Sequence, residues 1–82
     1  MPHVVAVGGD CARFADGATE FDVPAATVGE LIRALEARHP GLGDYIDRRM
    51  AIAIDGAIHQ DAFAEPLRPD SEVYLIPKIG GG

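Results

Sequence analysis

The residues that could carry chemistry lie at the end of this 82-residue chain, in the segment Lys78, Ile79, Gly80, Gly81 and Gly82. Because glycine makes up about 7% of an average protein, three in a row at a stated position are expected about 0.03% of the time. Glycine lacks a Cβ atom, so such a segment can enter a channel that excludes side chains. The pattern favours a thin flexible arm, residues 78–82, that carries a reactive C-terminal carboxylate.

This arm requires a docking surface on the domain before it. Extended, residues 78–82 reach roughly 17 Å, which is enough to enter the active site of a partner. Fixing each residue of the arm costs about 1–2 kcal/mol of conformational entropy, so a surface patch must supply the affinity. The alternative is an inert glycine tail, since chain termini are often disordered.

The last strand predicts where that patch lies. Residues 73–76 form an apolar run that Pro77 ends. If Val73 and Leu75 face a helix, alternation places Tyr74 and Ile76 on the outward side. Val5 or Val7, together with Ile58, are further candidates for the same surface. The alternative is that these are scattered surface apolar residues, which are common.

The other elements predict a compact α+β domain over residues 1–77. Strands are expected at 4–7, 19–23, 51–54 and 58–59, and the first two form a hairpin around residues 8–18. Thr27 and Glu30 make a capping box that starts one main helix, which Pro40 and Gly41 end. Residues 42–50, including Met50, are either loop or a short second helical turn. The order β-β-α-β-β-β predicts a mixed sheet of four to five strands packed on one helix.

Residues 70–82 resemble the C-terminus of the MoaD/ThiS sulfur carriers, in which acidic residues, a hydrophobic strand, a proline and an apolar residue precede a terminal Gly-Gly. The helix start at 26–31, the helix stop at 39–42 and the segment 54–56 also match that family. Gly80 departs from it, because the family tolerates various residues there. The resemblance implies a ubiquitin-like β-grasp fold.

The resemblance also implies a carrier and not an enzyme. An E1-like adenylyltransferase would use ATP to join AMP to the Gly82 carboxylate, and a sulfur donor would then leave a thiocarboxylate. That sulfur would pass to a synthase subunit in molybdopterin, thiamine, cysteine or similar biosynthesis, and the small subunit of a molybdopterin synthase fits the length best. Gly82 and Gly81 would form the reacting end, and partner binding would use Gly80, Ile79, Lys78, Ile76, Tyr74 and Ile58. The alternative is a ubiquitin-like modifier that joins Gly82 to lysines of target proteins.

Charge and composition exclude several other classes. Thirteen acids face seven Lys and Arg residues, for a net charge of −6, and no basic stripe exists for nucleic acid or an anionic membrane. The single cysteine, Cys11, favours a reducing compartment, and we expect a cytoplasmic protein. His3, His39 and His59 lack metal-ligand spacing, so we expect no metal and no permanently bound cofactor. A chain of this size also leaves little room for an internal active site.

Overall fold

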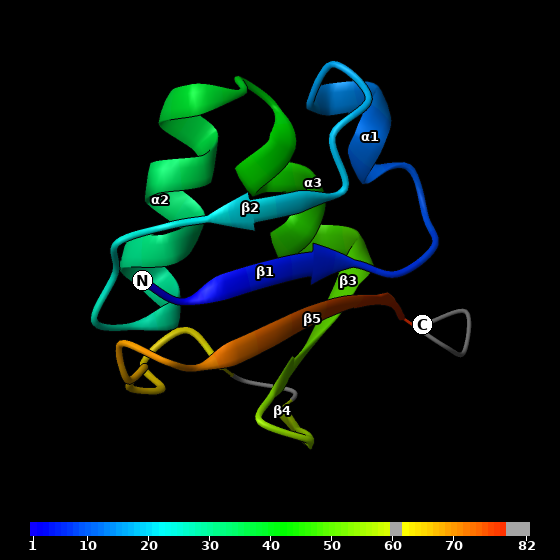
Figure 1. The fold of residues 1–82 in the computed structure, drawn as a ribbon. Helices are drawn as coiled ribbons and strands as arrows, with labels where there is room; N and C mark the ends of the chain where they lie inside the picture. The colour runs from blue at the N-terminus through cyan, green and yellow to red at the C-terminus, as the bar shows by residue number, and fades with distance from the viewer. Residues whose placement is uncertain (60–61, 79–82) are drawn as a thin grey trace.

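A mixed β-sheet forms the frame of the molecule. The computed structural model describes residues 1–59 and 62–78. Within these ranges five strands lie in the order β2-β1-β5-β3-β4. Only the β1–β5 pair of neighbours is parallel (Figure 1). The strands are β1 (His3–Ala6), β2 (Glu20–Asp22), β3 (Met50–Ile54), β4 (Ala57–His59) and β5 (Glu72–Pro77). The predicted mixed sheet and first hairpin are confirmed.

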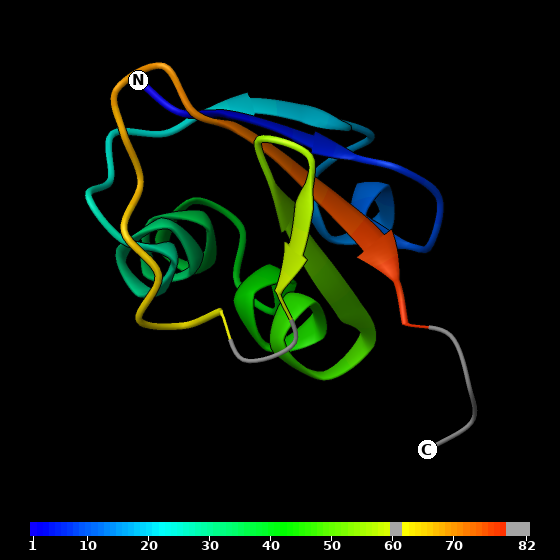
Figure 2. The same ribbon diagram turned by 90° about the horizontal axis from the view of Figure 1, so that it is seen from below.

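Helices cover one face of this sheet and leave the other face open (Figure 2). The main helix is α2 (Val28–Arg38), and α3 (Leu42–Arg49) follows it after a short turn. The ambiguous segment is therefore a helix, and Met50 begins β3 instead of belonging to a helical turn. A short helix, α1 (Cys11–Phe14), lies inside the predicted hairpin connection and was missed. Tertiary burial of Cys11 and stacking of Phe14 on Tyr45, with ring centroids 5.1 Å apart, explain this helix.

The turn between α2 and α3 depends on one carboxylate. The backbone N–H groups of Gly41 and Gly43 each donate to Glu36, at 2.9 Å. These two hydrogen bonds hold the pKa of Glu36 below its usual value. At the other end of α2, Thr27 Oγ1 accepts from the Glu30 N–H at 3.2 Å, so the predicted cap is confirmed.

The core lies between the sheet and the two longer helices. Leu31 and Leu35 of α2 are fully buried, as are Val73 and Leu75 of β5. The predicted strand parity is therefore confirmed: Val73 and Leu75 face the helices, and Tyr74 lies on the open face. Among residues 1–59 and 62–78, no helix combines the length and apolarity needed to span a bilayer.

Candidate functional site

The residue just before the tail is hydrogen-bonded to the C-terminal end of α3. Ile79, Gly80, Gly81 and Gly82 lie outside the described residues. Lys78 is exposed, and its backbone N–H donates to the Arg49 carbonyl at 2.9 Å. The Lys78 Nζ donates to the Asp47 carbonyl at 3.1 Å. Two hydrogen bonds therefore fix the point from which the C-terminal segment continues.

A row of side chains crosses the open face of the sheet through all five described strands. Tyr74 pairs with Val5 on one side and with Ala53 on the other, while Val5 pairs with Glu20 and Ala53 pairs with Ile58. Ile58 is 66% exposed and Tyr74 is 38% exposed. The register therefore places Tyr74, Ile58 and Val5 on one continuous surface. We call Val5, Tyr74, Ala53 and Ile58 the apolar row.

A second apolar group lies between this row and the start of the tail. Ile76 pairs with Ala51 of β3 and is half-buried. Val7 follows β1, is 47% exposed, and donates its N–H to the Leu75 carbonyl at 2.8 Å. The structure thus brings Ile76, Tyr74 and Ile58 to the same open face, with Lys78 at its end. Their binding role stays a prediction.

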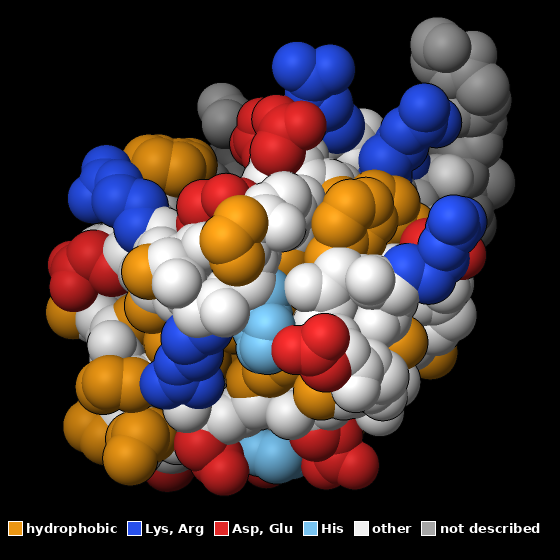
Figure 3. Space-filling view, turned by 90° about the horizontal axis from the view of Figure 1, so that it is seen from above, with side chains coloured by type: hydrophobic (Ala, Val, Ile, Leu, Met, Phe, Trp, Pro, Cys, Tyr) orange, Lys and Arg blue, Asp and Glu red, His pale blue; other side chains and the backbone are white. Residues whose placement is uncertain are grey.

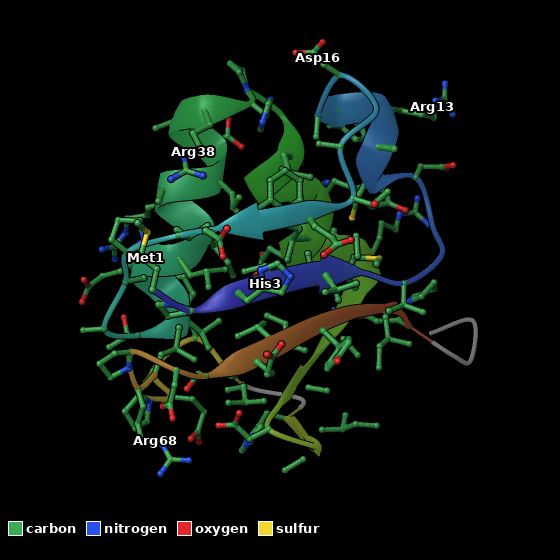
Figure 4. The ribbon with its side chains drawn as sticks, viewed as in Figure 1. Met1, His3, Arg13, Asp16, Arg38 and Arg68 are labelled. Carbon is green, nitrogen blue, oxygen red and sulfur yellow. The ribbon has the colours of Figure 1, made fainter. Side chains whose placement is uncertain are left out.

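An ionic cluster that sequence reasoning missed lies at the opposite end of this face. The His3 ring hydrogen-bonds through Nδ1 to Asp22 Oδ1 and through Nε2 to Glu20 Oε1, both at 2.9 Å. Carboxylate oxygens only accept, so both hydrogen bonds form together only when the two ring nitrogens each carry a proton. The hydrogen bond to Asp22 and then that to Glu20 raise the pKa of His3. Figure 4 shows His3 on β1, on the open side of the sheet.

The alternation of acidic residues in β2 is the feature of the sequence that could have predicted this cluster. In a strand, Glu20 and Asp22 must share a face, and the same face of a neighbouring strand holds every second residue. What the sequence did not show was that His3 pairs with Asp22. Figure 3 shows acidic side chains on either side of a histidine at its lower edge.

The hollow beside α3 offers little space for a ligand. A hollow between α3, β3 and β4 has a volume of about 70 Å³ and is lined by Ile46, Met50, Ile52, Lys78 and neighbouring residues. A drug-sized ligand needs a pocket of roughly 300–1,000 Å³, so this hollow is too small for one. No group of three His, Cys, Asp or Glu side chains within residues 1–59 and 62–78 is arranged to hold a metal ion. Cys11 is only 1% exposed, and burial raises the pKa of its thiol.

Known structures share this architecture. CysO in the BexX/CysO complex of Amycolatopsis orientalis superposes with a TM-score of 0.84 at 17% identity, covering 100% of both chains. SAMP1 from Haloferax volcanii gives 0.69 at 27% identity, covering 99% of this chain and 98% of its own. A chain from the complex of subunits 1 and 2 of the Helicobacter pylori molybdopterin-converting factor gives 0.66 at 23%, covering 99% and 97%. Comparison with curated protein sequences finds no match.

The match to a protein family covers nearly the whole chain. The ThiS family model matches residues 5–82, which include the second half of β1, the other four described strands, both longer helices and the terminal glycines. The mixed sheet with its parallel central pair and the helices on one face agree with the β-grasp architecture of the structural neighbours. The chain therefore belongs to the ThiS family of ubiquitin-like β-grasp sulfur carriers.

Proposed function

We propose that this carrier works through the carboxylate of Gly82. An E1-like enzyme directs a carboxylate oxygen to the α-phosphorus of ATP, which forms the acyl-adenylate and releases pyrophosphate. The terminal sulfur of a persulfide attacks the acyl carbon, and AMP leaves. A thiol then reduces the resulting acyl disulfide and leaves a thiocarboxylate on Gly82. The observation that carries this proposal is the ThiS family match, which runs through the terminal glycines.

In this scheme the carrier positions its own C-terminus, and the partner enzyme provides the catalysis. Gly80 and Gly81 would lie in the entrance channel of the partner, because glycine adds no side-chain width, and Lys78 and Ile79 would contact the partner at its mouth. Adenylation makes AMP the leaving group, so no acid or base of the carrier is required. Cys11 has no part in the scheme, since its thiol is buried.

The open sheet face supplies the docking surface. Tyr74, Ile76 and Ile58 would contact the adenylating partner, with the tail extending from the end of the same face. Two of the structural neighbours were solved with partner chains, one as the BexX/CysO complex and one as subunits 1 and 2 of a molybdopterin-converting factor. They support a second partner, a sulfur-accepting synthase subunit. No bound cofactor is part of the proposal, and a cytoplasmic location stays a prediction.

Truncation of the tail tests the proposal. Deletion of Gly82 removes the acceptor position while residues 1–78, which include the whole sheet, are unchanged. We expect ATP–pyrophosphate exchange by the E1-like enzyme of the same organism to be lost, with an unaltered thermal transition. Gly82→Ala is the matched control for length, because it keeps a carboxylate at position 82. Replacing Gly81 with Trp tests the width of the channel. An unchanged exchange rate in the truncated protein would remove the central claim.

A second candidate function is protein modification. SAMP1 from Haloferax volcanii is 27% identical, and the solved SAMP1 of Methanosarcina acetivorans is described as a small archaeal modifier protein. A modifier would join Gly82 to target lysines through an amide. Intact-protein mass spectrometry after incubation with the E1-like enzyme, ATP and a persulfide donor separates the two. Sulfur in place of one oxygen supports the carrier, whereas branched Gly82–lysine peptides alone support the modifier.

A further inference from the structure

The end of α3 leaves backbone carbonyls that need donors from outside the helix. Helix α3 ends at Arg49, and the N–H of Met50 closes its last turn by donating to the Ile46 carbonyl. The carbonyls that follow, beginning with that of Asp47, have no N–H donor within the helix. Lys78 supplies two donors, its backbone N–H to the Arg49 carbonyl at 2.9 Å and its Nζ to the Asp47 carbonyl at 3.1 Å. A residue near the C-terminus of the chain therefore caps α3.

The side chain of Lys78 suits this position in charge and in shape. The carbonyls at the C-terminal end of a helix carry the negative pole of its dipole, so an ammonium group is stabilising there. Lys78 also lines the hollow beside α3, together with Ile46 and Met50. Its aliphatic stem therefore covers apolar surface while its ammonium group reaches the Asp47 carbonyl. Both parts of the side chain hold Lys78 to the helix side of the molecule.

The strand that leads to Lys78 is held on both sides. Pro77 pairs with Met50 at the end of the β3–β5 ladder. On the other side, a Cβ atom built on Gly8 would lie 3.5 Å from Pro77 Cγ, so the chain after β1 packs against the proline ring. Lys78 is the last described residue of the chain. It is therefore the last position in the described part of the chain at which contacts with the domain set the course of the backbone.

We infer that Lys78 is a positioning residue for adenylation, an inference that rests on the proposed function. Its two hydrogen bonds to α3 set the direction in which residues 79–82 leave the domain. Four extended residues reach about 14 Å, so a swing of about 20° at Lys78 displaces the Gly82 carboxylate by about 5 Å. Fixing this direction in the free carrier lowers the entropy cost of placing the tail in the channel. The role is separate from contact with the channel mouth, because it is exerted before the partner binds.

Substitution of Lys78 tests this inference in ATP–pyrophosphate exchange with the purified E1-like enzyme. Lys78→Met removes the ammonium group but keeps an unbranched stem over the hollow, whereas Lys78→Arg keeps a cationic donor. We expect Lys78→Met to raise the KM for the carrier about tenfold and to leave kcat within about twofold, because the channel holds the tail once it has entered. Lys78→Arg should restore most of the loss. Arg38→Met is the matched control: it removes one positive charge from an exposed residue, which Figure 4 shows on α2 and away from the end of β5, and should leave KM unchanged.

A measurement on the free carrier separates positioning through α3 from direct contact with the enzyme. In Lys78→Met we expect the amide hydrogen of residue 78, corrected for its intrinsic rate, to exchange at least about fivefold faster than in wild type, with an unchanged thermal transition. Direct contact alone predicts no change in the free carrier. An unchanged exchange rate or an unchanged KM overturns the inference, and the proposed function stands as long as wild type is adenylated. If wild type is not adenylated at all, the proposed function fails and the positioning role fails with it.

Discussion

Truncation of Leu75 tests the strand parity on which the docking face depends. Leu75 lies in β5, the central strand, between Ala6 and Ile52, and its side chain is 0% exposed. Ile58 lies on the edge strand β4 and is 66% exposed. Leu75→Ala and Ile58→Ala therefore remove aliphatic carbons from opposite faces of the same sheet. Leu75→Ala leaves a cavity in the core, whereas Ile58→Ala shortens a side chain that is mostly exposed to solvent.

The expected magnitudes differ severalfold. Removing three buried carbons loses about 2.4 kcal/mol of transfer free energy. With the residual cavity, Leu75→Ala should lower the free energy of unfolding by about 3–5 kcal/mol. A domain of this length is stable by only about 4–12 kcal/mol. A loss of about 3 kcal/mol corresponds to a fall of about 12–24 °C in Tm. Ile58→Ala should cost less than about 1 kcal/mol, since most of that side chain is already in water.

Thermal and urea unfolding followed by circular dichroism measure both variants, and adenylation supplies the functional readout. Leu75→Ala should reduce Tm strongly but should be adenylated normally wherever it is folded. Ile58→Ala should keep its Tm and raise the concentration of carrier needed for half-maximal adenylation. The parity is wrong if Ile58→Ala proves the more destabilising of the two. The docking surface would then lie under the helices, which is incompatible with a partner reaching it.

Three further predictions concern other parts of the fold. The raised pKa of His3 means that the stability it contributes is fully present below its unfolded pKa of about 6.5 and is lost as pH rises through the higher folded pKa. The difference in Tm between wild type and His3→Gln should therefore be largest in mild acid and shrink toward alkaline pH; a pH-independent difference would contradict the imidazolium assignment. Gly43→Ala would place a Cβ 2.8 Å from the Glu36 Cβ and 3.2 Å from the Ile32 carbonyl oxygen, so unfolding in urea should show a loss of about 1–3 kcal/mol despite the better helix propensity of alanine. Cys11 should react with iodoacetamide at least about 100-fold more slowly in the native protein than in urea, as its thiol is exposed only on opening; rapid native labelling would show that α1 does not protect it.

Local patterns in the sequence were sufficient for several elements. Thr27 and Glu30 predicted the start of α2 because a cap needs only residues within one helical turn. Alternation in residues 73–76 predicted that Leu75 faces the core and Tyr74 the solvent, because strand geometry repeats every two residues. The terminal glycines identified the candidate reactive end. Each of these conclusions depends on neighbours in the chain, and the described residues confirm the first two.

Only the tertiary structure decided how these elements meet. The parallel pairing of His3–Ala6 with β5 joins the two ends of the chain, and no local pattern specifies it. That pairing places Val5 beside Tyr74, while the antiparallel edge brings Asp22 to His3. Residues of α1 and α3 became helical because burial against the core outweighed weak local signals. The cluster of His3, Asp22 and Glu20 likewise exists only in the folded protein, because the histidine and the two acids come from separate strands.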